Sequence, residues 1–286
     1  MNLLNITPTP IKLASGVTIN YARAGSGPAL FFIHGAMGDW RMWASQWEPF
    51  TAQFDCISYS RRYTQPNSNP LLTDDHSAFV DAEDLLGIMD GLGIEKAVLV
   101  GSSYGGFTAL ALAVQAPERV LAVVSVEAPM MRYGQMTEAG AKVVQEHLET
   151  SSWPARDAFL RGDDRQGVAI LTGGIMGIAP EDIPADVLER RMGNALSARS
   201  LSVSRDAFPL IEPDALAALP MPVLLVSGAK TAPIHAAVFA QVRAAMPDAS
   251  VSMIPDAGHS VALQQPQAFN AAVLAFLERH GLATIG

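Results

Sequence analysis

Residues 96–107, K-A-V-L-V-G-S-S-Y-G-G-F, decide the fold that this sequence predicts. The run 96–100 is short, apolar and partly β-branched, which is typical of a buried strand, and the Ala/Leu-rich run 107–115 predicts a helix. Ser103 therefore lies in a tight turn between a strand and a helix, with a glycine two residues away on each side. These glycines relieve crowding in the turn, and the helix directs its positive end and free amides toward any bound group.

Two other apolar runs end in turns that contain glycine. Residues 29–33, A-L-F-F-I, lead into residues 34–38, H-G-A-M-G. Residues 251–255, V-S-M-I-P, lead into residues 256–260, D-A-G-H-S. Three predicted strands thus deliver a glycine-rich turn, a serine and a histidine in that chain order, which is a pattern of nucleophilic catalysis.

On these residues the chain resembles the α/β-hydrolase superfamily over nearly its whole length. The resemblance implies that Ser103 is the nucleophile and His259 the general base. It also implies that the backbone amides of Ala36 and Tyr104 form the oxyanion hole. The other five histidines are expected to have packing or surface roles, with His34 supporting its turn.

The triad acid is the point at which the sequence departs from the commoner family pattern. Most members carry the acid in the loop after the penultimate strand, where residues 228–233 of this chain place Thr231 instead of an aspartate. Threonine cannot carry the negative charge that stabilises an imidazolium. Either the triad lacks an acid, or the end of another strand supplies one.

Glu127 is the preferred acid, because it ends the strand after the nucleophile helix and Pro129 follows it closely. Some relatives in the superfamily, including haloalkane dehalogenases and some lactone hydrolases, place their acid at that strand end. Glu127 would then hold His259 in the productive tautomer; the alternative is a hinge residue bonded to backbone amides. Asp256 is a third candidate, but it lies only three residues before the histidine and is poorly placed to reach the far nitrogen of the ring.

Strands and helices alternate along the chain, which favours a mostly parallel sheet with helices on both faces. From Met130 to Pro213 the pattern is helical and lacks convincing strands. We therefore predict an α/β-hydrolase fold whose core, residues 1–129 and 214–286, is interrupted by a helical cap, residues 130–213. In members of the superfamily with this layout, the substrate binds between cap and core.

Composition excludes several classes of protein. The chain has 286 residues, 49% of them hydrophobic, which is ample for a sizeable core. A formal net charge of −9 without a long basic block argues against nucleic acid as a partner. A single cysteine excludes an internal disulfide, and no apolar run approaches the roughly 20 residues that span a bilayer. The first residues lack the features of a signal peptide, so we expect a cytoplasmic protein without a membrane partner.

The sequence contains neither a metal-binding constellation nor a dinucleotide fingerprint. The histidines are dispersed, Cys56 has no partner cysteine, and the glycine spacing of residues 101–106 differs from the dinucleotide motif. We therefore expect no cofactor and no metal, and a small molecule as the substrate.

The pocket is less visible than the catalytic residues. Apolar residues near the glycine turns or on the expected inner face of the cap could form an adaptable pocket, although each could equally belong to the core. They are Met37, Trp40, Trp43, Tyr104, Met130, Met131 and Met176. Together they indicate a moderately hydrophobic acyl group or lactone. Arg61 and Arg62 could meet a carboxylate, but a structural salt bridge is the favoured use.

A serine nucleophile disfavours the dehalogenases and epoxide hydrolases of the superfamily, which carry aspartate at this turn. The resemblance therefore implies hydrolysis of a carboxylic ester or lactone of a moderately hydrophobic small molecule through an acyl-enzyme intermediate. Two enzymatic alternatives are hydrolysis of a carbon–carbon bond and cofactor-independent addition of O₂ to a heteroaromatic ring. A third alternative is a small-molecule binding protein without turnover, against which the intact Ser103 and His259 argue.

Overall fold

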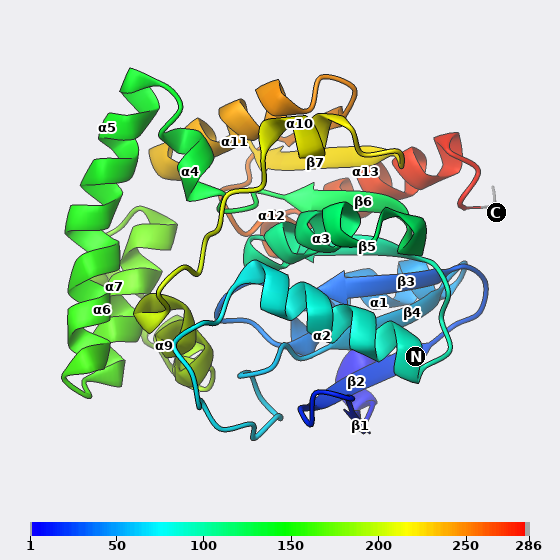
Figure 1. Cartoon of the computed structure of the whole chain (residues 1–286), viewed down its shortest axis with the longest axis horizontal. Helices are drawn as coiled ribbons and strands as arrows, with labels where there is room; N and C mark the ends of the chain where they lie inside the picture. Colours follow the sequence, from blue (N-terminus) through cyan, green and yellow to red (C-terminus); the bar gives the residue numbers. More distant parts are fainter. Residues whose placement is uncertain (1, 284–286) are drawn as a thin grey trace.

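The computed structural model describes residues 2–283, and an eight-stranded sheet forms its centre (Figure 1). The strands are β1 (Thr9–Lys12), β2 (Thr18–Ala24), β3 (Ala29–Ile33), β4 (Asp55–Tyr59), β5 (Ala97–Ser102), β6 (Val120–Val126), β7 (Val223–Gly228) and β8 (Ser250–Ile254). Their order across the sheet is β1-β2-β4-β3-β5-β6-β7-β8. The pairs β1–β2 and β2–β4 are antiparallel, and all later neighbours are parallel. The chain thus has the mostly parallel sheet of an α/β-hydrolase fold.

The inner strands are apolar because helices cover both faces of the sheet. Every residue of β5 and of β7 is buried, so these strands are continuous apolar runs instead of alternating ones. Phe31 and Leu99 point into one apolar cluster, whereas their neighbours Phe32 and Val100 point into another on the opposite face. The two faces together form a core that fixes the positions of the strand ends.

Different helices contribute to these two clusters. The first cluster includes residues of α2 (Ala78–Gly91), α3 (Tyr104–Gln115), α10 (Pro213–Ala217) and α11 (Pro233–Ala245). The second includes residues of α1 (Ala44–Thr51), α12 (Val261–Gln264) and α13 (Pro266–Arg279). No helix among residues 2–283 is long and apolar enough to cross a membrane.

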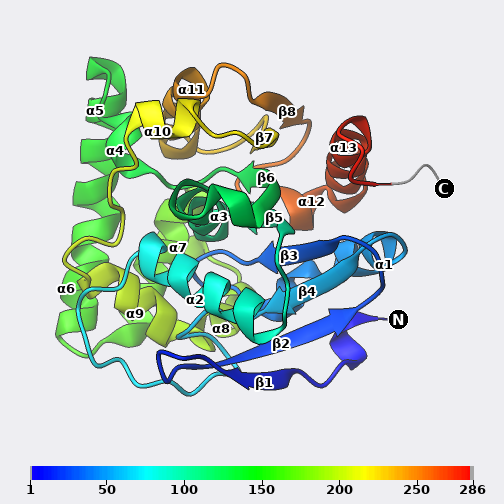
Figure 2. The same ribbon diagram turned by 45° about the vertical axis from the view of Figure 1, so that its right-hand side comes forward.

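Residues between β6 and β7 form helices and turns without a strand. These helices are α4 (Met131–Gly134), α5 (Glu138–His147), α6 (Trp153–Leu160), α7 (Asp164–Met176), α8 (Ala185–Met192) and α9 (Ala195–Val203), followed by α10. Figures 1 and 2 show α5, α6, α7 and α9 gathered beyond one edge of the sheet. Phe159 and Val168 of these helices form a small apolar cluster with Met37 of the core. This contact seats the helical region over the turn that follows β3.

The carboxyl ends of five neighbouring parallel strands carry the residues that the sequence singles out. The turn 34–38 follows β3, Ser103 follows β5, and Glu127 follows β6. Thr231 lies shortly after β7, and His259 lies in the loop after β8. Ligands of parallel α/β sheets bind at this edge, so the fold gathers these residues where a substrate can reach them.

Candidate active site

Ser103 occupies the turn between β5 and α3 in a backbone conformation that is rare outside glycine, with φ 53° and ψ −122°. Its amide donates a hydrogen bond of 2.7 Å to the carbonyl oxygen of Val126. A Cβ atom on Gly101 would lie 2.2 Å from the Gly105 oxygen, and one on Gly105 would lie 2.1 Å from the Ile33 oxygen. The turn therefore requires glycine on both sides, and it holds the serine in a strained position above the end of its strand.

Glu127 and His259 are joined by a hydrogen bond of 2.6 Å between Oε2 and Nδ1. The carboxylate is buried, and its Oε1 accepts hydrogen bonds from Ser227 Oγ at 2.8 Å and from the Gly228 amide at 2.9 Å. Oε2 also accepts a bond of 2.8 Å from Thr231 Oγ1. Four donors therefore surround this carboxylate, which compensates for its removal from water.

The surroundings of Glu127 set the tautomer of His259. Burial raises the pKa of Glu127, but the hydrogen bond and charge of His259, with the Gly228 amide, outweigh burial and hold that pKa below its ordinary value. An ionised carboxylate only accepts hydrogen bonds, so the proton of the neutral imidazole is on Nδ1. Nε2 is then left as an acceptor, which is the form that a general base needs.

The other two candidates for the triad acid have different partners. Thr231 donates to Glu127, so the residue at the commoner acid position binds the carboxylate of the preferred candidate. Asp256 has an exposed carboxylate that pairs with Lys230 at 2.6 Å. The carboxylate that contacts His259 is that of Glu127.

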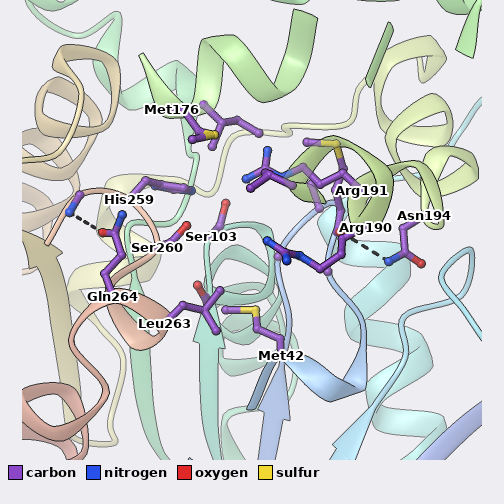
Figure 3. Close-up of a pocket in the computed structure, with 18 of the residues that line it drawn as sticks. Met42, Ser103, Met176, Arg190, Arg191, Asn194, His259, Ser260, Leu263 and Gln264 are labelled. Atoms are coloured by element: carbon purple, nitrogen blue, oxygen red, sulfur yellow. Dashed lines mark hydrogen bonds between the residues drawn. The ribbon is translucent and has the colours of Figure 1, made fainter. Parts of the chain in front are cut away.

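Ser103 and His259 line the same cavity, and Figure 3 shows both side chains directed into it. Within residues 2–283, no hydrogen bond joins the Ser103 hydroxyl to the imidazole. Catalytic bonds of this kind are commonly long before substrate binds and tighten in the complex. The structure therefore places the predicted nucleophile and the predicted base at one cavity.

Two backbone amides flank this serine. Tyr104 is the first residue of α3, where an amide has no partner within the helix, and its hydroxyl donates to the Ala207 oxygen at 2.6 Å. Ala36 lies in the turn after β3, and its carbonyl accepts hydrogen bonds from Ser197 Oγ at 2.7 Å and from Arg61 Nη2 at 3.3 Å. In the described part of the chain, neither amide is paired with another protein group. Both amides are free to donate to a substrate oxygen.

Arg61 and His34 fix the turn that carries Ala36. The buried guanidinium pairs with Asp81 and lies 4.8 Å from the centre of the Tyr104 ring. The Arg61 amide donates to His34 Nε2 at 2.9 Å, and His34 Nδ1 donates to the Gly35 oxygen at 2.8 Å. Burial, with the charge of Arg61, lowers the pKa of His34 to about 4, so this ring is neutral at pH 7. The arginine is used in a structural ion pair, which is the use that the sequence favours.

His235 makes a contact with the candidate base that sequence reasoning missed. Its ring, from α11, stacks on the His259 ring with centroids 3.7 Å apart and planes inclined by 17°. Its Nε2 donates to the Ile175 oxygen at 3.1 Å. Burial, with the charge of His259, lowers the pKa of His235 to about 3, so this ring is neutral. The one available signal was its place four residues after Thr231, close to the loop that carries the acid in most relatives.

Glu127, His235 and His259 also form a group that sequence spacing does not reveal. Their potential metal-ligating atoms lie within 4.8 Å of one another. Glu127 and His259 bond each other, however, and His235 bonds a backbone oxygen, so atoms that a metal would need already have protein partners. These contacts join a carboxylate and an imidazole, with a second imidazole stacked on the first.

A cavity of about 920 Å³ lies over Ser103 and His259. The core contributes the turn 34–38 and Leu263 of α12, and the helical region contributes residues from the end of α7 to Asn194. A cavity of this size accommodates a small organic molecule. It lies between the core and the inserted helices.

The seven apolar residues that the sequence analysis considered for the pocket divide into two groups. Met37 and Met176 line the cavity. Trp40 and Trp43 are buried in one core cluster, and Tyr104 and Met130 are buried in the other, against which Met131 packs. These five side chains belong to the core, and none of them lines the cavity.

Comparison with known proteins gives an independent result. Residues 30–272 match the family model described as the alpha/beta hydrolase family. The putative carbamate hydrolase RutD of Caulobacter sp. (strain K31) is 25% identical over 272 residues, which are 90% of this chain and 95% of that protein. Carboxylesterase YbfK of Bacillus subtilis (strain 168) is 26% identical over 256 residues, 87% of this chain and 80% of that protein. The solved structure of Est816, described as an N-acyl homoserine lactone degrading enzyme, matches with a TM-score of 0.73 at 21% identity, over 94% of this chain and 100% of that one.

Proposed function

Because the chain belongs to the alpha/beta hydrolase family and is a hydrolase, we propose that it cleaves a carboxylic ester or lactone of a moderately hydrophobic small molecule through an acyl-enzyme intermediate. The observation that carries the proposal is the Glu127–His259 pair, which leaves an accepting imidazole nitrogen beside the cavity that Ser103 lines. The two relatives, a putative carbamate hydrolase and a carboxylesterase, support attack on a carbonyl carbon.

The first half of the reaction acylates the serine. Nε2 of His259 accepts the proton of Ser103 as Oγ attacks the carbonyl carbon, and the carbonyl double bond opens to an oxyanion. The amides of Ala36 and Tyr104 donate to that oxyanion, and Glu127 stabilises the imidazolium. When the oxyanion collapses, the bond to the alkoxy oxygen breaks, and the imidazolium returns its proton to that oxygen.

The second half releases the acid. His259 takes a proton from water as the water oxygen attacks the acyl carbon, and a second oxyanion uses the same two amides. Collapse of this intermediate breaks the bond to Ser103 Oγ, which recovers its proton from the imidazolium. A lactone would follow the same steps, with the leaving hydroxyl remaining part of the product.

The lining of the cavity supports an acyl group of moderate hydrophobicity. Met37 and Met42 from the core, Ile175 and Met176 from α7, and Leu263 from α12 contribute apolar surface. Methionine side chains adapt to different shapes, which suits a pocket for a flexible acyl chain. Because polar side chains share this lining, the pocket does not require a purely apolar substrate.

Quenched-flow kinetics with 4-nitrophenyl butyrate test the proposal. We expect rapid release of about one equivalent of nitrophenolate, with a butyryl adduct on Ser103 in the quenched protein. The Ser103→Ala variant is expected to give neither the burst nor the adduct. Product formation that requires O₂, or turnover without a serine adduct and unaffected by Ser103→Ala, would contradict the proposal.

A further inference from the structure

Arg191 extends from α8 into the cavity that contains Ser103. Its side chain is partly buried, and its Nη1 atom is fully buried without a hydrogen-bond partner in the described part of the chain. A buried donor that lacks a partner is costly, and more so when it belongs to a charged group. Because the side chain also lines the cavity, a substrate group that accepts hydrogen bonds can approach the guanidinium from the cavity side.

The other basic side chains that line the cavity each pair with an acid. The pairs are Arg41–Asp39, Lys230–Asp256 and Arg190–Asp186, at 2.6, 2.6 and 2.7 Å. Arg191 has no acidic partner among residues 2–283. Burial, with the charge of Arg190, lowers the pKa of Arg191 to about 10, so the guanidinium remains positive at pH 7. The cavity thus contains one positive charge that the protein does not pair.

The position of Arg191 relates this charge to the reacting atoms. In Figure 3, Arg190 and Arg191 extend into the cavity from the side opposite His259, toward Ser103. A substrate whose carbonyl carbon lies at Ser103 can therefore extend toward α8. Because Arg191 lines the same cavity, a group at that end of the substrate can meet its guanidinium.

We propose that Arg191 binds a carboxylate of the substrate, so that the preferred substrates are esters or lactones with an anionic group remote from the bond that is cleaved. The planar guanidinium matches the two oxygens of a carboxylate in geometry. One unpaired cation balances a monoanion, which favours a carboxylate over a doubly charged phosphate. This proposal rests on the function proposed above, because it assigns the orientation of the substrate at Ser103.

A matched pair of substrates tests the proposal. Mono-4-nitrophenyl adipate carries a terminal carboxylate, and the corresponding adipamate ester carries a neutral amide of similar shape. We expect the ratio of kcat/KM for the anionic ester to kcat/KM for the neutral ester to fall about 10- to 100-fold in Arg191→Gln, the range for losing hydrogen bonds to a charged group. Arg191→Lys should retain part of the preference.

Arg165→Gln provides the control, because Arg165 pairs with Glu189 of the same helical region and does not line the cavity. This variant should leave the ratio unchanged. A ratio that Arg191→Gln does not alter would overturn the proposal, even if Ser103-dependent hydrolysis of both esters were observed.

A binding measurement separates this proposal from the proposed function. Titration calorimetry of the Ser103→Ala protein with monomethyl adipate requires no turnover, and dimethyl adipate is the neutral control. We expect monomethyl adipate to bind more tightly than the diester and to lose about 10- to 100-fold in affinity on adding Arg191→Gln. Equal affinities for the two compounds in the Ser103→Ala protein would overturn the proposal without use of an Arg191 variant. Arg191-dependent binding without Ser103-dependent hydrolysis would instead contradict the proposed function alone.

Discussion

Thr231 donates a hydrogen bond of 2.8 Å to the same carboxylate oxygen of Glu127 that binds His259. The residue at the position where the sequence analysis expects the acid in most of the superfamily thus binds a carboxylate from a different strand. The two strands are neighbours, with Val126 of β6 opposite Val226 of β7, so their carboxyl ends lie side by side. A carboxylate at the end of β6 can therefore reach the same imidazole nitrogen as a carboxylate at the end of β7.

The first prediction concerns this acid. Glu127→Gln should lower kcat for an activated ester by about 10⁴-fold, because an amide does not stabilise the imidazolium and can impose the wrong tautomer. Thr231→Ala removes one of four bonds to the carboxylate, so we expect a loss of no more than about 10-fold. Steady-state kinetics of the two variants compare these effects. A larger loss in Thr231→Ala than in Glu127→Gln would show that the acid has been assigned to the wrong residue.

The second prediction concerns the nucleophile turn. Gly101→Ala and Gly105→Ala would each bring a Cβ atom to within 2.2 Å of a backbone oxygen, which the turn cannot relieve by rotating a side chain. We expect both variants to be strongly destabilised and recovered in low yield. Gly87→Ala in α2 is the control, since a Cβ there makes only ordinary contacts with Leu13, and alanine favours the helix. If thermal denaturation gave the same melting temperature for all three variants, that result would contradict the described geometry.

The third prediction concerns the buried ion pair behind the oxyanion turn. Arg61→Met leaves the Asp81 carboxylate buried without its guanidinium, so the free energy of unfolding should fall by about 3–5 kcal/mol. The double variant Arg61→Met/Asp81→Leu removes both charges and should recover most of that loss. Turnover should be lower than in the wild type in both variants, because Arg61 also binds the carbonyl of Ala36. Urea denaturation gives the stabilities, and a double variant no more stable than Arg61→Met would refute the explanation.

The fourth prediction concerns stability in acid. His235 has a pKa of about 3 in the folded protein, against about 6.5 when exposed. Between these values the unfolded state binds a proton that the folded state does not, so acid favours unfolding. From pH 7 to pH 5, this histidine should cost the wild type about 2 kcal/mol of stability. His235→Phe keeps an aromatic ring against His259 and removes the titration, so its stability should fall by about 2 kcal/mol less over that range. If urea denaturation showed that the wild type and His235→Phe lose the same stability from pH 7 to pH 5, that result would argue against a neutral, buried His235.

Local patterns in the sequence predict where several residues of the candidate site lie in the fold. Ser103, the turn 34–38 and His259 each follow an apolar strand, and the strand ends meet because the sheet is parallel. The preference for Glu127 also depends on setting aside Thr231 and Asp256, since a buried carboxylate at a strand end could also have bonded backbone amides. The structure shows that it does both: it accepts from the amide of Gly228 and from His259.

Other parts of the site depend on how distant helices pack, and no local pattern encodes them. The stacking of His235 on His259 requires the placement of α11, and the entry of Arg191 into the cavity requires the placement of α8. Apolar residues pose a different difficulty, because the same side chain suits a core and a pocket. Trp40 and Met130 are near the expected site in sequence, yet they pack into the core.

Labelling with a fluorophosphonate, followed by peptide mapping, tests most directly whether Ser103 is activated by His259. We predict a single adduct on Ser103, retained in Ser102→Ala, abolished in Ser103→Ala and formed far more slowly in His259→Ala. An adduct on another residue, no adduct at all, or labelling of Ser103 at an unchanged rate in His259→Ala would contradict the account.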